Sequence, residues 1–139
     1  MRGEEYTRPN FVVILLDDHG FGDLGANTDG AVSETPRMDE IASSGVRFLD
    51  WHAGMSVCTP SRAALLTGRY GLRTGVTSNF VPASNGGLPS SEHTIAELLA
   101  PAGYDSHAIG KWHLGHRAPH HPTFHGFATW YVSFPREAF

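Results

Sequence analysis

Cysteine is nearly absent from this sequence, because Cys58 is the only one among 139 residues. A single cysteine excludes an internal disulfide framework and any zinc ribbon built from several cysteines. Charged residues are scarce at 17%, while apolar residues reach 40%, a balance that excludes an intrinsically disordered chain. The net charge of −4 argues against a general nucleic-acid binder, since such proteins neutralise phosphates with a basic face.

Long hydrophobic runs are also missing. The longest purely apolar run covers residues 11–16, far short of a membrane span. No apolar stretch precedes Pro9, so no secretion signal is visible, which by itself favours a cytosolic protein or a chain whose leader is missing. The length allows one domain with a real core, and no internal repeat divides it.

Segments with strand and helix patterns alternate along the chain. Three short apolar segments predict strands, at residues 11–16, 46–51 and 104–109, and the first is the continuous apolar type buried in parallel sheets. Three segments that each end at a glycine predict helices, at residues 36–44, 59–67 and 94–102. Residues 81–91 and 115–139 are expected to be loops. The alternation predicts an α/β fold, with a mostly parallel or mixed sheet flanked by helices.

Polar residues follow two of the predicted strands. Asp17 and Asp18 follow the first strand, and Lys111 and His113 follow the last, so parallel strands would bring them to one edge of the sheet. Carboxylates are hard ligands suited to Ca²⁺ or Mg²⁺. On an extended segment, Lys111 and His113 would share one face and Trp112 the other. The alternatives are a solvated Asp-Asp turn, a surface lysine and a capping histidine.

Cys58 precedes a predicted helix start. Pro60 suits the first helical position and Thr59 the N-cap, which places Cys58 just outside the helix. The unpaired amides of the first turn, the helix dipole and the nearby Arg62 would then suit an oxyanion such as sulfate or phosphate. The alternatives are that Cys58 is a small buried hydrophobe and Arg62 an exposed arginine on the helix surface.

Histidine is abundant: the chain has nine, and most of them lie in its last third. Five of them offer imidazoles to Zn²⁺ or Ni²⁺: His113, His116, His120, His121 and His125. Their spacing matches no strong zinc pattern, and Pro119 and Pro122 break any helical register. The favoured interpretation is that these residues flank a pocket mouth or decorate a loop.

Several separated motifs resemble those of the type I sulfatases. Residues 58–68, Cys-Thr-Pro-Ser-Arg-Ala-Ala-Leu-Leu-Thr-Gly, resemble the family signature. Residues 9–18, 22–25 (Gly-Asp-Leu-Gly) and 110–115 (Gly-Lys-Trp-His-Leu-Gly) resemble further blocks of that family in the correct order. Residues 86–89, Gly-Gly-Leu-Pro, look closest to the arylsulfatases of the A and G type. The resemblance is strongest over residues 9–127, whereas residues 128–139 diverge.

The resemblance implies that residues 1–139 form the N-terminal part of an alkaline-phosphatase-like sulfatase catalytic domain, which is incomplete. It implies hydrolysis of sulfate monoesters through a Cα-formylglycine made from Cys58. It assigns a divalent cation, usually Ca²⁺ with Mg²⁺ as the alternative, to Asp17, Asp18 and residue 58. Arg62 would anchor the site. Lys111 and His113 would contact the sulfate and the formylglycine hydroxyls.

The same resemblance implies aryl or carbohydrate sulfates as substrates, a formylglycine-generating enzyme as a partner, and a lysosomal or secreted location. Because the family draws further ligands from later in its chain, we expect this chain to be inactive by itself. An incomplete sheet would expose an apolar edge and favour self-association. Two alternatives remain open: a phosphoryl or phosphonate hydrolase of the alkaline phosphatase superfamily, and a non-catalytic chain that binds a partner.

Overall fold

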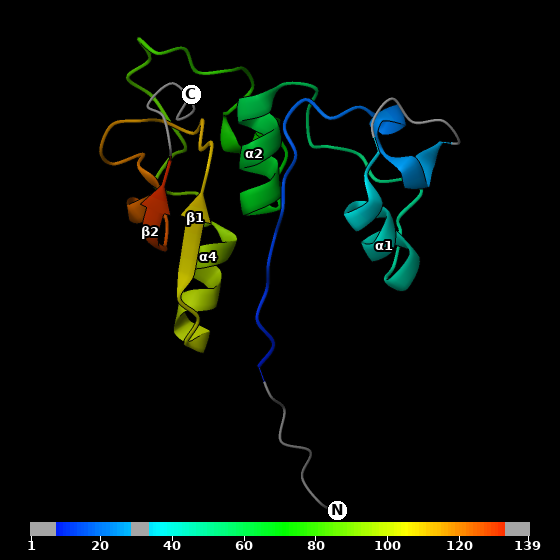
Figure 1. Cartoon of the computed structure of the whole chain (residues 1–139). Coiled ribbons are helices and arrows are strands. Elements are labelled where there is room, and N and C mark those ends of the chain that lie inside the picture. The colour runs from blue at the N-terminus through cyan, green and yellow to red at the C-terminus, as the bar shows by residue number, and fades with distance from the viewer. Residues whose placement is uncertain (1–7, 29–33, 133–139) are drawn as a thin grey trace, which may run out of the picture. The chain divides into compact units, whose positions relative to one another are not determined.

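The computed structural model describes residues 8–28 and 34–132 (Figure 1). The chain divides into two compact units, Met1–Leu49 and Asp50–Phe139. Residues 1–7, where the sequence shows no secretion signal, and residues 133–139, the end of the segment expected to diverge, lie outside the described residues. Within the described ranges, no helix combines the length and apolar character needed to span a membrane.

The first unit is built around α1 (Pro36–Ser44), which confirms the helix predicted from the sequence. Pro36 lies in its first turn, and the N–H of Gly45 closes its end on the carbonyl of Ile41 at 2.9 Å. Two short 3-10 helices precede it, η1 (Phe21–Asp23) and η2 (Gly25–Asn27). The carboxylate of Asp39 joins α1 to η2, because it accepts the N–H of Ala26 at 2.8 Å.

The strand predicted for residues 11–16 is not formed. These residues have no strand partner among those described, and their side chains are exposed, from 44% at Leu16 to 85% at Val12. A buried strand exists only where neighbouring strands satisfy its N–H and C=O groups. The apolar run therefore carries the composition of a buried strand without the ladder that would make it one. The strand predicted for residues 46–51 is wrong in the same way.

The second unit contains the remaining helices. The prediction for residues 59–67 is confirmed by α2 (Cys58–Thr67), which ends at Gly68 with a φ of 67°. After α3 (Gly71–Thr74), the third predicted helix appears as α4 (Ile95–Leu99) continued by η3 (Ala100–Ala102). Thr94 caps α4: its hydroxyl accepts the N–H of Glu97 at 3.3 Å, and the Glu97 carboxylate accepts the N–H of Thr94 at 2.8 Å.

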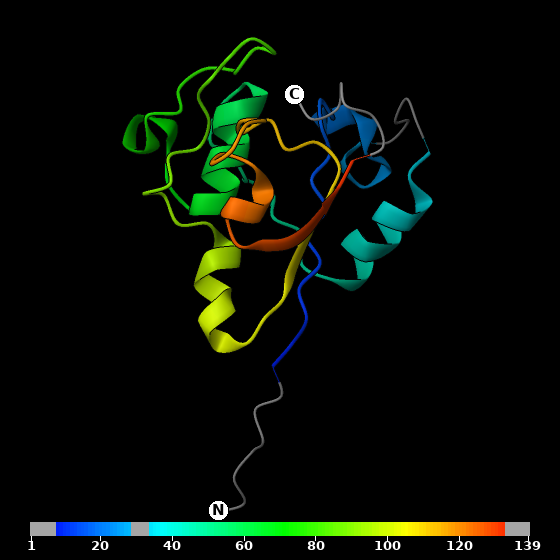
Figure 2. The same ribbon diagram turned by 90° about the vertical axis from the view of Figure 1, so that its left-hand side faces the viewer.

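The sheet of the described residues has two parallel strands, which lie side by side (Figure 2). Both strands follow α4 in the sequence. The first, β1 (Ser106–Ile109), lies within the predicted strand 104–109. The second, β2 (Phe127–Tyr131), lies in a segment predicted to be loop, so that prediction is wrong there. The register pairs His107 with Thr129 and Ile109 with Tyr131.

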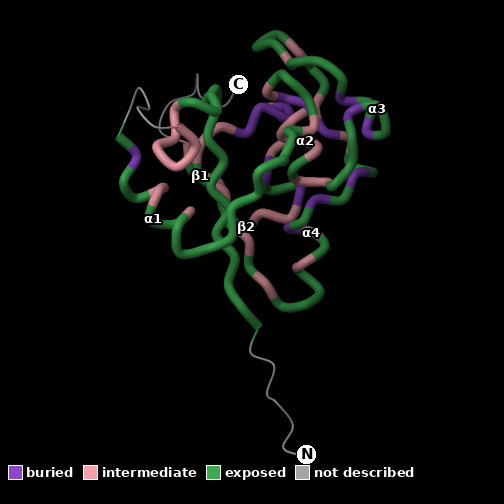
Figure 3. The backbone as a smooth tube through the Cα atoms, turned by 90° about the vertical axis from the view of Figure 1, so that its right-hand side faces the viewer, coloured by how far each residue is buried: buried purple, intermediate pink, exposed green. Residues whose placement is uncertain are grey.

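The core of the second unit lies between α2 and the segment that follows β1. Five residues form it: Ala63, Val76, Leu88, Trp112 and Leu114. Figure 3 shows the buried positions gathered around α2 and α3. A Cβ at Gly87 would lie 2.3 Å from the Cβ of His120, so only glycine allows residues 86–88 to approach the chain this closely. Leu88 then donates its N–H to the carbonyl of Leu114 at 2.8 Å.

His125 lies fully buried in this unit, with its ring 6.0 Å from that of Trp112. Burial lowers the pKa of His125 below its ordinary value of 6.5, although the Glu97 carboxylate, 4.0 Å away, acts in the opposite direction. The folded state therefore keeps a neutral ring where the unfolded chain takes up a proton. Its contribution to stability is present above pH 6.5 and is lost as the pH falls below that value.

We expect the free energy of unfolding of the wild-type chain to fall between pH 7.5 and pH 5 more steeply than that of His125→Phe, whose ring does not titrate. Urea unfolding followed by tryptophan fluorescence at both pH values measures this. His93→Gln, at an exposed position, is the control and should keep the wild-type slope. Equal pH dependence of wild type and His125→Phe would refute the assignment.

Candidate active site

The start of α2 differs from the sequence prediction by one position. Val57, in extended conformation, is the N-cap, and Cys58 is the first residue of the helix rather than a residue just outside it. The hydroxyl of Thr59 does not cap its own helix. It donates instead to the carbonyl of His113 at 2.9 Å, and the N-cap, Val57, has no side-chain acceptor to offer.

The amides of the first turn of α2 are largely occupied. The N–H of Thr59 donates to Oδ1 of Asn79 at 2.9 Å, the N–H of Ser61 donates to the carbonyl of Val57 at 3.2 Å, and Pro60 has no N–H. The expectation of several unpaired amides waiting for an oxyanion is therefore wrong at these three positions. Charged side chains must supply most of the attraction for an anion here.

Two side chains of α2 hold the segment that follows β1. Arg62 donates from Nη1 to the carbonyl of Lys111 at 2.8 Å, and Thr59 donates to the carbonyl of His113. Residues three apart on a helix share one face, so the two donors reach two carbonyls of one continuous segment, residues 111–113. We call these two hydrogen bonds the α2 clamp. The guanidinium of Arg62 thus has a partner on the backbone, unlike an arginine exposed on a helix surface.

The α2 clamp brings Lys111 to the cysteine. The ammonium Nζ of Lys111 lies 3.6 Å from Sγ of Cys58, and both residues are half-buried. The sequence separates these residues widely, and only the approach of the segment to α2 places them in contact. A cation against the sulfur atom is the arrangement that stabilises negative charge developing at this position.

His113 is held by its ring as well as by its backbone. Its Nε2 lies 2.8 Å from the carbonyl oxygen of Phe80. A carbonyl only accepts, so Nε2 carries the proton of the neutral ring, and Nδ1 is its acceptor nitrogen. The backbone of His113 has a φ of 56°, so the segment is not extended, and the predicted alternation of Lys111, Trp112 and His113 does not apply.

Asn79 and Phe80 are site residues that the sequence analysis missed. They sit in a loop twenty residues beyond Thr59, with no spacing or motif that marks them. The only available signal is indirect: a helix that begins without a side-chain cap needs an acceptor from elsewhere. Asn79 supplies that acceptor.

Asp17 and Asp18 belong to the first unit, where both are exposed. Asp18 has a φ of 54°, and His113 is the one other residue besides glycine with a positive φ in the described ranges. Aspartate and histidine enter this region more readily than most residues, at a cost of about 1–3 kcal/mol. Such backbone outliers concentrate at functional sites. The consecutive carboxylates of Asp17 and Asp18 are a hard-oxygen donor set that fits Ca²⁺ or Mg²⁺.

The histidines do not form a transition-metal site. Within residues 8–28 and 34–132, no three of their imidazoles lie near enough to share one ion. His120 donates from Nδ1 to the carbonyl of Leu88 at 2.9 Å, and His121 bonds Thr123 at 2.9 Å, so these two act in local structure. The loop interpretation of these residues fits these contacts.

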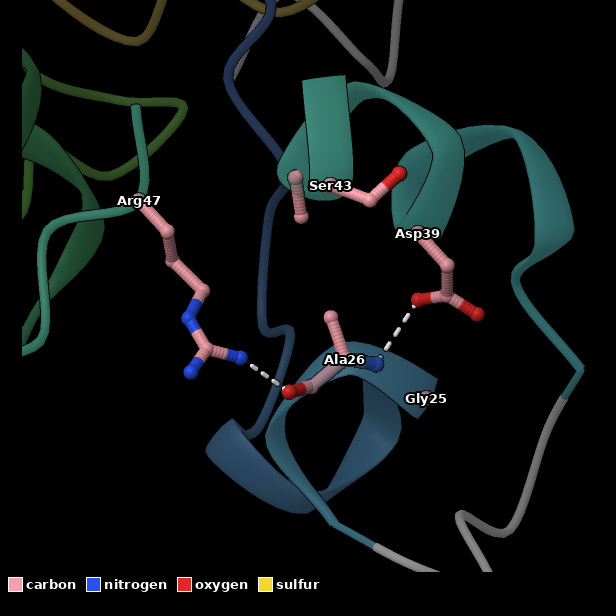
Figure 4. A pocket seen from close by; sticks show the side chains of 6 residues that line it. Gly25, Ala26, Asp39, Ser43 and Arg47 are labelled. Atoms are coloured by element: carbon pink, nitrogen blue, oxygen red, sulfur yellow. Dashed lines mark hydrogen bonds between the residues drawn. The ribbon is translucent and has the colours of Figure 1, made fainter. Parts of the chain in front are cut away.

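A shallow hollow of about 470 Å³ lies within the first unit (Figure 4). Arg47 crosses it to donate to the carbonyl of Ala26, and Asp39 accepts from the amide of the same residue. Gly25 of η2 and Ala42 and Ser43 of α1 complete its wall. None of the predicted site residues lines it, and its polar contacts hold η2 against α1.

Comparison with known proteins agrees with the motifs. The family model described as Sulfatase matches residues 9–137. Arylsulfatase G from Homo sapiens is 56% identical over 128 residues, which cover 92% of this chain and 24% of that protein. N-acetylgalactosamine-6-sulfatase from Mus musculus is 46% identical over 133 residues, which cover 90% of this chain and 25% of that protein. The chain therefore spans about a quarter of the length of the relatives it matches.

Solved structures give the same answer for the fold. The crystal structure of Ps i-CgsB superimposes with a TM-score of 0.78 at 41% identity, over 84% of this chain and 26% of that one. The structure of BT1596, titled a 2-O GAG sulfatase, superimposes with a TM-score of 0.62 at 32% identity, over 78% of this chain and 22% of that one. The expected fold, an incomplete part of the alkaline-phosphatase-like sulfatase architecture, is confirmed. With its helices, its small parallel sheet and its signature at the start of α2, the chain belongs to the sulfatase family.

Proposed function

We propose that this chain is the part of a sulfuric ester hydrolase that carries the nucleophile. The observation that supports this most directly is the contact of 3.6 Å between Nζ of Lys111 and Sγ of Cys58 at the start of α2. Sulfate monoesters resist hydrolysis because a nucleophile must approach an anion. A fixed cation beside the nucleophile lowers that barrier.

The chemistry of the proposal starts from oxidation of Cys58 to Cα-formylglycine by a formylglycine-generating enzyme. As its hydrate, residue 58 would supply one hydroxyl that attacks sulfur while the alcohol or phenol leaves. Deprotonation of the second hydroxyl would then expel sulfate and regenerate the aldehyde. Lys111 stabilises the charge that develops on the sulfate oxygens. His113 takes the proton of the second hydroxyl at Nδ1, because its Nε2 proton is held by the carbonyl of Phe80. Arg62 positions Lys111 by donating a hydrogen bond to the backbone carbonyl of Lys111.

A divalent cation completes the proposal. Asp17 and Asp18 would hold Ca²⁺, or Mg²⁺ in its place, through carboxylate oxygens that are exposed in the first unit. Bound there, the ion supplies positive charge that polarises the ester. The further ligand expected at residue 58 stays a prediction.

We further propose aryl or carbohydrate sulfates as substrates and the lysosomal or secretory route as the location.

The test is a chimaera in which residues 9–137 replace the matching stretch of human arylsulfatase G, produced together with a formylglycine-generating enzyme. We expect the chimaera to hydrolyse an aryl sulfate at least about tenfold faster than the corresponding aryl phosphate, each assayed as kcat/KM. Unaltered arylsulfatase G is the control for both assays. Faster hydrolysis of the phosphate would favour the phosphoryl hydrolase, and a folded chimaera inactive on both esters would favour the non-catalytic chain.

A further inference from the structure

Thr59 is a polar residue with no exposed surface, at the second position of α2. Its hydroxyl and its amide both form hydrogen bonds. Its hydroxyl donates to the carbonyl of His113 at 2.9 Å and accepts the N–H of Phe80 at 3.3 Å. Its amide donates to Asn79, as described above. A fully buried threonine with this many partners ties together three segments that are distant in sequence.

These contacts form a closed ring of hydrogen bonds. The Thr59 hydroxyl binds the backbone of His113, the His113 ring binds the carbonyl of Phe80, and the N–H of Phe80 returns to the Thr59 hydroxyl. Each bond restricts the next, since the bond from the Phe80 N–H to Thr59 holds the residue whose carbonyl meets the His113 ring. The ring therefore fixes both the position of His113 and the nitrogen that holds its proton.

The left-handed backbone of His113 makes this support necessary. At a φ of 56°, the residue occupies a conformation that persists only where surrounding contacts hold it. The bond from Thr59 ends on the carbonyl of His113, directly beside that strained torsion. Loss of the bond would release the backbone and the ring together.

We propose that Thr59 is a positioning residue that sets the orientation and the tautomer of the His113 imidazole through its hydroxyl. The reaction step assigned to His113 rests on the proposed function, but the control of its tautomer by Thr59 does not. Valine has the shape of threonine without the hydroxyl, and serine keeps the hydroxyl without the methyl group. The pair Thr59→Val and Thr59→Ser therefore separates hydrogen bonding from packing.

The first test uses the 139-residue chain and needs no substrate. Ring nitrogen and carbon chemical shifts in NMR spectra report which nitrogen of His113 is protonated. We expect a single tautomer protonated at Nε2 in the wild type and in Thr59→Ser, and a mixture of tautomers in Thr59→Val. A folded Thr59→Val protein that keeps the wild-type tautomer would overturn the proposal.

A second measurement covers the case in which Thr59→Val does not fold. Hydrogen exchange of the Phe80 amide in the folded wild type and in Thr59→Ser should be slowed at least about tenfold relative to exposed loop amides, because this amide donates within the ring. Exchange at the rate of an exposed amide in both proteins would show that the ring does not exist.

The chimaera described above relates the proposal to catalysis. Thr59→Val is expected to lower kcat about tenfold or more and to move the pH–rate profile, with KM changed little, whereas Thr59→Ser restores both. An unchanged profile in an active Thr59→Val chimaera counts against a role for this residue in positioning His113. Inactivity of the unsubstituted chimaera would instead count against the proposed function, while the NMR result would still decide the control of the tautomer.

Discussion

Replacement of Cys58 by alanine is expected to abolish sulfate ester hydrolysis by the chimaera. The proposed reaction forms its covalent bond at residue 58, and alanine offers neither a thiol to oxidise nor an oxygen to attack sulfur. Removal of a nucleophile of this kind typically costs about 10³-fold or more in turnover. Lys111 would keep its charge beside the empty position, so binding of the anion is expected to fall much less than kcat.

The assay compares kcat/KM for an aryl sulfate among wild-type, Cys58→Ala and Ser56→Ala chimaeras. Ser56 is an exposed residue two positions before the cysteine, so its substitution tests whether any change in this segment is harmful. We expect Ser56→Ala to match the wild type. Retention of more than about a tenth of the activity by Cys58→Ala would remove residue 58 from the mechanism.

Mass spectrometry of the same protein separates two causes of low activity. Trypsin releases residue 58 within the peptide 48–62, where an aldehyde and a thiol differ in mass. We expect the aldehyde in material made together with the formylglycine-generating enzyme. A thiol in that material would contradict the proposed modification, whatever the activity.

Replacement of Trp112 by alanine is expected to unfold most of the second unit. Trp112 is only 5% exposed, packs edge-on against Phe127 at 5.8 Å between ring centroids, and donates from Nε1 to the carbonyl of His120 at 2.9 Å. Substitutions of this kind in a core cost about 3–5 kcal/mol. That loss is comparable to the whole free energy of unfolding of a small domain.

Urea unfolding followed by circular dichroism measures this loss. Trp51→Ala is the matched control in the same unit, because Trp51 is 73% exposed and its removal is expected to cost less than about 1 kcal/mol. Equal destabilisation by the two substitutions would show that Trp112 is not part of a packed core. Loss of the Trp112 side chain would also disturb the candidate site, since Trp112 lies between Lys111 and His113 in the chain.

Helices were predicted well because their signals are local. Pro36 and Gly45 bracket α1, and Pro60 and Gly68 bracket α2, within a residue of the predicted bounds. Each of these residues acts on its own turn of backbone, so its effect does not depend on distant parts of the chain. The capping pair Thr94 and Glu97 is local in the same sense.

Strands were predicted poorly because a strand depends on a partner. Residues 11–16 have the required composition but no neighbouring strand, whereas Phe127–Tyr131 forms β2 although prolines and histidines precede it. The parallel partner β1 supplies the ladder that the local sequence does not reveal. Composition alone therefore missed β2 and overrated residues 11–16.

Contacts around the candidate site could be predicted only in part. Cys58 and Lys111 were placed near one another by the resemblance, and the structure brings them into contact. The partners of Thr59, in contrast, could not be foreseen, because its hydroxyl serves His113 and Phe80 instead of the helix it begins. A buried hydroxyl chooses among acceptors by three-dimensional proximity, which spacing along the chain does not encode.

The α2 clamp couples the length of the segment that follows β1 to the spacing of residues along α2. Three residues of helix rise about 4.5 Å, while two residues of extended chain span up to about 7 Å. The turn at His113 shortens the segment toward the distance between Thr59 and Arg62 along α2. One residue inserted between Lys111 and His113 would throw the two carbonyls out of step with Arg62 and Thr59. Insertions between Lys111 and His113 should thus be rejected.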